Sequence, residues 1–189
     1  MILDVRQLAW RMILLGGACV IVQIAAISQV TIFGAHVDLT PIVVAFAGLL
    51  CGSLAGAVFG FGVGLFLDLA LVQPVGMTAL LFLALGYAAG RLRELRDPQS
   101  AVVPVAVAAA ATAGAEIGFS VMSFLLGRDA PVGFDLLGEI VVTILLNAAV
   151  AIPVHGVVRR WLSRALPEDP RRRRRRAYTT GGLSPLSRP

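Results

Sequence analysis

Long stretches without a charged side chain are the feature that most restricts how this chain can fold. Met12–Phe33 and Leu39–Leu67 contain no Asp, Glu, Lys or Arg, whereas arginines cluster between such stretches. Uncharged runs of about 18 residues or more match the roughly 30 Å hydrocarbon core of a bilayer. With 58% hydrophobic and 14% charged residues among 189, little sequence remains for a soluble domain. We therefore expect an all-α, polytopic integral membrane protein.

The apolar residues predict six helical segments within a membrane domain of residues 1–166. The stretch 39–69 would be about 46 Å long as one helix, which is too long for a single crossing. Pro41 and the sequence Cys51-Gly52-Ser53 predict a break in it. The resulting short second segment either spans the bilayer or is re-entrant. The six predicted segments cover about 12–33, 41–51, 53–69, 75–90, 101–126 and 134–158.

The arginines predict the orientation, because short loops rich in Lys and Arg stay in the cytoplasm. They lie before the first segment, after the fourth and after the sixth, at Arg6, Arg11, Arg91, Arg93, Arg96, Arg159, Arg160 and Arg164. An even number of crossings must then separate Arg11 from Arg91, and two legs within 39–69 provide it. We expect a membrane protein with both termini in the cytoplasm.

The polar, Arg-rich segment 167–189 has no apolar periodicity and is predicted to be a disordered cytoplasmic tail. Its basic run is Arg171, Arg172, Arg173, Arg174, Arg175 and Arg176. Because this run closely follows a membrane helix, anionic lipid is a nearer partner than nucleic acid. We interpret these arginines as an anionic-lipid or topology anchor.

Glycines at four-residue spacing predict close helix packing, because small residues let helix backbones approach one another in lipid. Packing within the bundle is the main interpretation, and an interface between two copies of the chain, a homodimer, is the alternative. The predicted packing residues are Gly52, Gly56, Gly60, Gly64, Gly86, Gly90, Gly114 and Gly118.

Four polar side chains in or beside the apolar segments are candidate functional groups: Asp38, Asp68, Glu116 and Asn147. Asp68 is expected to accept hydrogen bonds from the turn that begins at Gln73. A charged group is costly at the depth of Glu116, so this residue either makes a functional contact or is a neutral, hydrogen-bonded carboxylic acid. Asn147 lies at a similar depth and is its predicted partner.

Enzymatic chemistry has little support in the sequence. His36 and His155 fall on opposite sides of the predicted membrane, and Cys19 and Cys51 have no metal-binding neighbours in sequence. A phosphate-binding loop and a cluster of metal ligands are also absent from the pattern. We predict a protein that is not an enzyme and that uses no cofactor or metal.

The central stretch 37–92 resembles MreD, a small membrane protein of the bacterial rod-shape system. The resemblance rests on Val37-Asp38-Leu39, the glycine-rich break Leu49-Leu50-Cys51-Gly52-Ser53-Leu54-Ala55-Gly56, Gly64-Leu65-Phe66-Leu67-Asp68, Pro74-Val75-Gly76 and Leu85-Gly86-Tyr87-Ala88-Ala89-Gly90. The family's usual Pro-Asp is Val37-Asp38 here, with a proline displaced to Pro41.

This resemblance implies a non-enzymatic component of the cell-elongation complex. Its partners would be an MreC-like protein and the cell-wall synthase formed by a SEDS glycosyltransferase and a class B penicillin-binding protein. The six-helix layout is also similar to the substrate-binding subunits of energy-coupling-factor vitamin transporters. A small-molecule transporter subunit is therefore the alternative function, although a vitamin site would require converging aromatic and polar groups.

Overall fold

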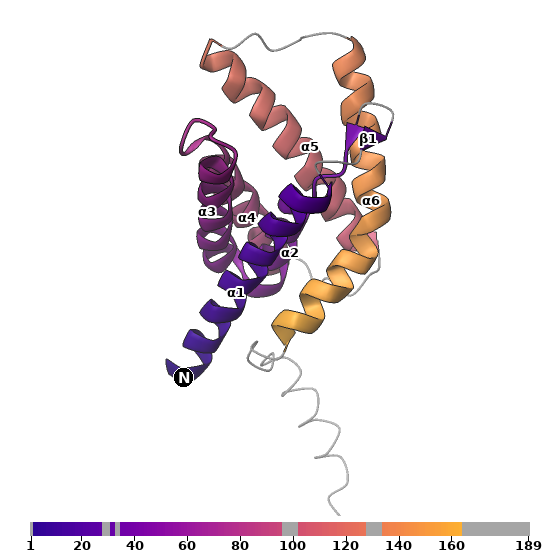
Figure 1. Cartoon of the computed structure of the whole chain (residues 1–189). Coiled ribbons are helices and arrows are strands. Elements are labelled where there is room, and N and C mark those ends of the chain that lie inside the picture. Colours follow the sequence, from indigo (N-terminus) through magenta and orange to yellow (C-terminus); the bar gives the residue numbers. More distant parts are fainter. Residues whose placement is uncertain (1, 28–30, 33–34, 96–101, 128–133, 164–189) are drawn as a thin grey trace, which may run out of the picture.

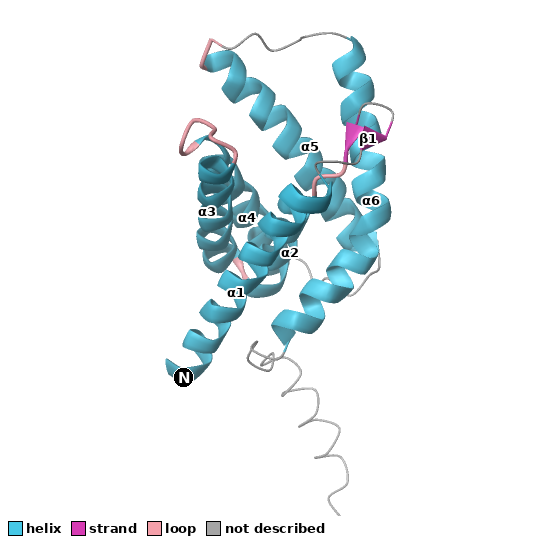
Figure 2. Ribbon diagram, in the orientation of Figure 1, coloured by secondary structure: helices cyan, strands magenta, loops and turns pink. Residues whose placement is uncertain are grey.

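The computed structural model describes residues 2–27, 31–32, 35–95, 102–127 and 134–163. These residues form six α-helices and one two-stranded antiparallel sheet (Figures 1 and 2). The elements are α1 (Ile2–Val22), the π-helical turn η1 (Gln23–Ile27), β1 (Thr31–Ile32), β2 (Ala35–His36), α2 (Leu39–Cys51), α3 (Ser53–Ala70), α4 (Met77–Leu95), α5 (Val102–Leu125) and α6 (Phe134–Ser163).

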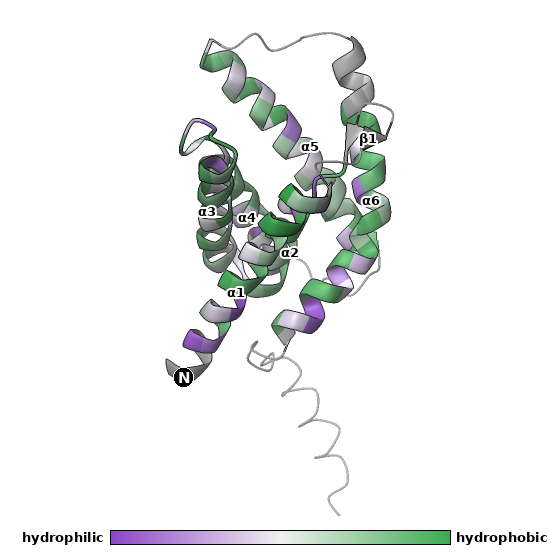
Figure 3. Cartoon of the chain, viewed as in Figure 1, coloured by the Kyte–Doolittle hydropathy of each residue, from purple (hydrophilic) through white to green (hydrophobic). Residues whose placement is uncertain are grey.

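Four helical stretches are long and apolar enough to cross a membrane: Arg6–Ala25, Ser53–Ala70, Val102–Leu125 and Ile140–Ser163. Figure 3 shows apolar residues along the helices and hydrophilic residues near the N-terminus of α1 and the last turns of α6. This distribution indicates a membrane protein with an all-helical membrane region.

Helix α2 is the centre of the bundle and is shorter than a bilayer is thick. Its 13 residues give a length of about 20 Å, against roughly 30 Å for the hydrocarbon core. Every residue from Thr40 to Leu49 is buried, and α2 contacts all five other helices. An apolar helix that is buried all round needs no polar face, which explains why this stretch has none.

The break between α2 and α3 lies at the residue that the sequence predicted. Helix α2 ends at Cys51 and α3 begins at Ser53, while Gly52 between them has φ +100°. A side chain is strained at this φ, so glycine is needed for the chain to reverse here. The reversal places α3 antiparallel to α2, with α4 packed against both.

The first predicted segment ends earlier than expected. The prediction was a membrane segment over 12–33, but the α-helical hydrogen-bonding pattern ends at Val22. The π-helical turn follows, and residues 31–32 and 35–36 pair as the β1–β2 strands beside α6. Continuous hydrophobicity did not separate these elements, because all of them are uncharged. The tail 167–189 with Arg171–Arg176 lies outside the described residues.

Arginines of α1 and α4 bond to the last turns of other helices at one end of the bundle. Arg11 of α1 donates from Nη1 to the Trp161 carbonyl at 2.8 Å, and Trp161 Nε1 donates to the Arg11 carbonyl at 3.1 Å. Arg93 of α4 donates to the carbonyl of Leu50, beside the α2–α3 break. The α3–α4 turn lies at the opposite end, near the last turn of α5 (Figure 1).

Candidate functional site

Three glycines from three helices meet where α2, α3 and α4 cross. A Cβ on Gly48 would lie 2.3 Å from the Gly86 carbonyl oxygen, and one on Gly86 would lie 2.2 Å from the Gly56 carbonyl oxygen. These neighbours are backbone atoms, which cannot turn aside as a flexible side chain can. The three backbones are therefore in direct contact, and any larger residue would force the helices apart. Sequence reasoning missed Gly48 because the row was traced only from Gly52 onward, although Gly48 lies four residues earlier, on the helix before the break.

The α3–α4 contact continues along both helices. A Cβ on Gly60 would lie 2.1 Å from the Phe82 carbonyl oxygen, one on Gly64 2.6 Å from Ala79 Cα, and one on Gly90 2.3 Å from Ser53 Cα. The predicted packing row thus includes Gly56, Gly60 and Gly64 on α3 and Gly86 and Gly90 on α4. Figure 1 shows α3 and α4 side by side.

Three predicted packing glycines behave differently. A Cβ on Gly52 would meet nothing within 4 Å, so this residue is required for its positive φ and not for space. Gly114 and Gly118 of α5 face the Leu85 and Leu81 side chains of α4, at 3.0 and 2.3 Å from a built Cβ. The α4–α5 contact is therefore side chain to backbone, and it is less extensive than the α3–α4 contact.

Two amide side chains satisfy the non-helical backbone that enters α2. Gln23 Nε2 donates to the Val37 carbonyl at 3.2 Å, and Gln23 Oε1 accepts from Leu39 N at 3.0 Å. From the other side, Asn147 Oδ1 accepts from Asp38 N at 3.2 Å and Asn147 Nδ2 donates to the Asp38 carbonyl at 3.1 Å. We call Gln23 and Asn147 the amide clamp.

The amide clamp provides hydrogen-bond partners for the backbone that enters α2. Non-helical backbone is tolerated at membrane depth only where the protein itself satisfies its N–H and C=O groups. The first N–H groups of α2 are accounted for in this way: Gln23 accepts from Leu39, Asp38 Oδ1 accepts from Thr40 at 3.0 Å, and Pro41 has no N–H. Asp38 is thus the N-cap of α2. A short helix can then begin inside the bundle without an unpaired backbone N–H group.

Asn147 extends this network to α5. It is fully buried, and Nδ2 donates to Thr112 Oγ1 at 2.9 Å. The predicted partner, Glu116, lies one helical turn beyond Thr112. The prediction rested on equal depth in the membrane and was within one turn of α5. The Nδ2 group of Asn147 donates to Thr112 and Asp38 instead. Glu116 itself is half-buried, and its carbonyl accepts from Ser120 Oγ at 2.9 Å.

Asp68 links the end of α3 to the start of α4. It is 1% exposed, and its carboxylate accepts from Gly76 N at 2.8 Å, Thr78 N at 3.2 Å and Ala79 N at 3.4 Å. These are the unsatisfied donors that precede and begin a helix, so Asp68 caps α4 from a different helix. The predicted bonding to the turn between Gln73 and Gly76 is the arrangement found. A structural role explains this carboxylate.

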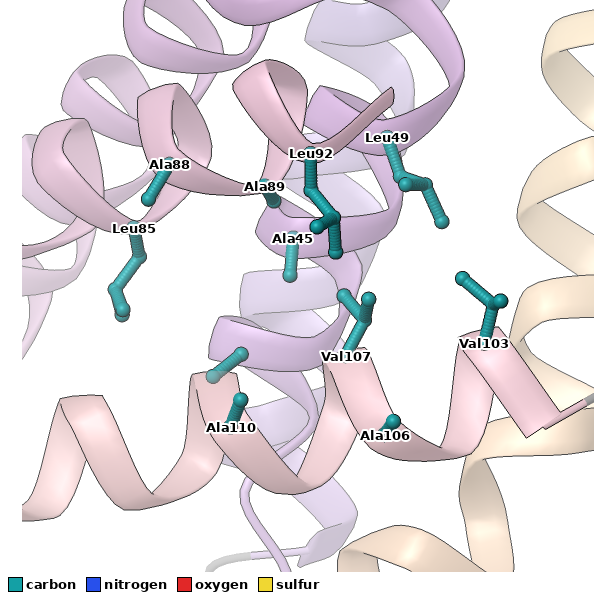
Figure 4. A pocket seen from close by; sticks show the side chains of 11 residues that line it. Ala45, Leu49, Leu85, Ala88, Ala89, Leu92, Val103, Ala106, Val107 and Ala110 are labelled. Carbon is teal, nitrogen blue, oxygen red and sulfur yellow. The ribbon is translucent and has the colours of Figure 1, made fainter. Parts of the chain in front are cut away.

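A half-open cavity of about 460 Å³ lies between α4 and α5 and reaches α2 (Figure 4). Eleven side chains line it, and all are alanine, leucine or valine. Leu85 and Ala110 lie towards one end, and Leu49, Leu92 and Val103 lie towards the other (Figure 4). The volume falls within the roughly 300–1,000 Å³ of ligand pockets. The lining, however, offers no polar side chain to orient a hydrophilic ligand.

Catalytic and metal-binding constellations are not found among the residues that the structure describes. No group of three or more His, Cys, Asp or Glu there could hold a metal ion. Cys19 and Cys51 are free thiols. His155 packs edge-on against Phe46, with ring centroids 5.0 Å apart, which is a packing contact in the core.

The structure therefore defines a class: a helical membrane protein with a short central helix, buried from Thr40 to Leu49, and a glycine-packed three-helix unit. Comparison with models of protein families, with curated proteins and with solved structures found no match to this chain.

Proposed function

We propose that this chain is a membrane component of the bacterial cell-elongation complex that acts through protein contacts, as MreD does. The observation that carries the proposal is the coincidence of the resemblance with a structural unit. The stretch 37–92 comprises α2, α3 and most of α4, which pack through Gly48, Gly56 and Gly86. The residues that resemble the family are therefore those that form one closely packed unit.

The polar residues of this unit support a scaffold. Asp38 caps α2 and Asp68 caps α4, so both carboxylates accept hydrogen bonds from backbone N–H groups at helix starts. Gln23 and Asn147 satisfy backbone groups. Groups that serve the fold in this way leave little chemistry for catalysis, and a rigid bundle suits a protein that presents surfaces to partners.

The proposed setting is the plasma membrane, with both termini in the cytoplasm. Arg11 joins the middle of α1 to Trp161 in the last turn of α6, and Arg93 reaches the α2–α3 break. One bundle end thus collects the arginines, which the positive-inside rule assigns to the cytoplasm. The proposed partners are an MreC-like protein and the synthase pair of a SEDS glycosyltransferase and a class B penicillin-binding protein. Arg171–Arg176 would meet anionic lipids.

The alternative function is a vitamin-type transporter subunit. The structure contains a cavity, but its lining does not suit a vitamin. Transported vitamins carry polar groups, and specific sites place a few polar side chains against them. The cavity beside Leu85 and Ala110 has none. A scaffold therefore remains the function that the geometry supports best.

Complementation and copurification test the proposal together. The full chain would be expressed in a rod-shaped bacterium depleted of its own MreD, with that host's MreC or the cognate MreC present. We expect restored rod shape and copurification of MreC from solubilised membranes. Gly60→Leu, which places a large side chain against the Phe82 carbonyl, is the misfolded control. Round cells and absent MreC, despite normal accumulation in the membrane, would refute the proposal, and a stoichiometric bound metabolite would favour the transporter.

A further inference from the structure

Arginines lie near one end of the apolar cavity between α4 and α5. An apolar cavity with positive charge at one end indicates the class of its ligand. Leu92 lines the cavity and is 37% exposed. Its neighbours in sequence are Arg91, which is exposed, and Arg93, which is half-buried. Arg93 donates from Nη1 to the carbonyl of Leu50, and Leu50 follows the lining residue Leu49. The guanidinium of Arg93 is therefore held at the end of α2 and α4 at which Leu49 and Leu92 line the cavity.

We propose that this cavity binds one anionic phospholipid, with an acyl chain between α4 and α5 and the phosphate headgroup at Arg93. The inference does not depend on the proposed function. Basic pockets between membrane helices on the cytoplasmic side are suited to anionic headgroups. A guanidinium carries five N–H donors and matches the geometry of phosphate oxygens, so the bond to Leu50 orients Arg93 without using all of its donors.

The shape of the cavity fits an acyl chain. Figure 4 shows the lining side chains spread along α4 and α5, from Leu85 and Ala110 to Leu92 and Val103. From Leu85 to Leu92 the helix rises by about 10 Å. Ala88, Ala106 and Ala110 are exposed lining residues, so the small side chains leave an open side through which a chain can enter. A wholly apolar slot accepts a hydrocarbon and gives no bonds to a polar metabolite.

The energetics decide which experiment is informative. Bilayer lipid is as apolar as the slot, so burying a chain there gains little over leaving it in the membrane. Selection of one lipid over another must therefore come from the contact between its headgroup and Arg93. The expected signature is a preference for an anionic over a zwitterionic lipid with identical chains, of roughly fivefold for one arginine beside an anionic group.

Native mass spectrometry of the full chain would measure this preference. The protein would be reconstituted in nanodiscs with equal phosphatidylglycerol and phosphatidylcholine of the same acyl chains, then released and weighed. We expect one retained lipid per chain, with phosphatidylglycerol exceeding phosphatidylcholine roughly fivefold. Equal retention of the two lipids by the unmodified chain would overturn the proposal.

Matched variants separate the slot from the headgroup site. Ala88→Phe fills the slot and should abolish the retained lipid, whereas Ala84→Phe, at an exposed α4 position outside the lining, should keep it. Arg93→Gln should reduce the lipid preference to near equality, and Arg159→Gln on α6 should not. Arg93→Gln leaves the slot intact, so it remains decisive if Ala88→Phe does not fold. Undiminished phosphatidylglycerol in Ala88→Phe, or an unchanged preference in Arg93→Gln, would contradict the assignment.

Discussion

Replacing Asn147 with leucine should destabilise the protein, because it removes one arm of the amide clamp. Asn147 makes three hydrogen bonds, two with the backbone of Asp38 and one with Thr112 Oγ1. At the average of about 0.6 kcal/mol for an interhelical bond in a membrane protein, three bonds contribute about 2 kcal/mol, and at the measured maximum about 5 kcal/mol. The part-buried backbone groups of Asp38 would be left without these partners, which favours a cost above the minimum of this range.

The free energy of unfolding in bicelles, measured by steric trapping, would test this expectation. We expect Asn147→Leu to lower it by about 2–5 kcal/mol. Leu145→Val, at a position on α6 that is 65% exposed, is the control and should stay within about 0.5 kcal/mol of the unmodified chain. Thr112→Val, combined with Asn147→Leu in a double-mutant cycle, should give a coupling energy of about 0.6–1.7 kcal/mol.

An unfolding free energy for Asn147→Leu that matches Leu145→Val would refute the reasoning. It would mean that the segment entering α2 reaches water, or finds other donors, and that the clamp is not needed. A large effect without coupling to Thr112 would keep the clamp on Asp38 but remove the link to α5.

Three further changes should shift the same unfolding free energy in directions set by local geometry. Gly60→Ala should cost about 1–3 kcal/mol because its methyl group meets the backbone of α4. A Cβ on Gly62 meets nothing within 4 Å, so Gly62→Ala should be neutral or stabilising through helix propensity. Equal effects of the two substitutions would refute the packing argument. Asp68→Ala should cost about 1–2 kcal/mol through loss of the α4 cap, and Asp68→Asn should retain most of it; an innocuous alanine would contradict the capping role. Val72 has φ +54° and is 92% exposed, so Val72→Asn should stabilise the protein by about 1 kcal/mol. The control Val75→Asn should not stabilise it. A loss of stability in Val72→Asn would show that the Val72 side chain is needed.

The break between α2 and α3 was predictable because its physics is local. The uncharged stretch is too long for one crossing, and Gly52 supplies the conformation that a reversal needs. The glycine row on α3 was predictable for the same reason, since regular spacing on one helix defines a surface. Gly48 continues the same spacing onto α2, but its contact with Gly86 was not predictable because it depends on how two helices cross.

The amide clamp shows where sequence reasoning ends. Asn147 stood out as a polar residue in an apolar helix, and depth pointed to the correct region of α5. Its actual partners, Thr112 and Asp38, depend on rotation of the helices about their axes, which hydrophobicity does not encode. The role of Gln23 was not predicted because the uncharged run continues past Val22, where α1 ends. Long-range bonds of this kind arise only when the bundle assembles.

Cysteine labelling across the membrane tests the central claim, a broken hairpin whose break lies on the cytoplasmic side, most directly. In a Cys19→Ser, Cys51→Ser background, Leu54→Cys would report on the start of α3, where Leu54 is 77% exposed, and Gln73→Cys would report on the α3–α4 turn. A membrane-impermeant maleimide should label Leu54→Cys only in inverted vesicles and Gln73→Cys only in intact spheroplasts. Labelling of both cysteines from the same side would contradict the account.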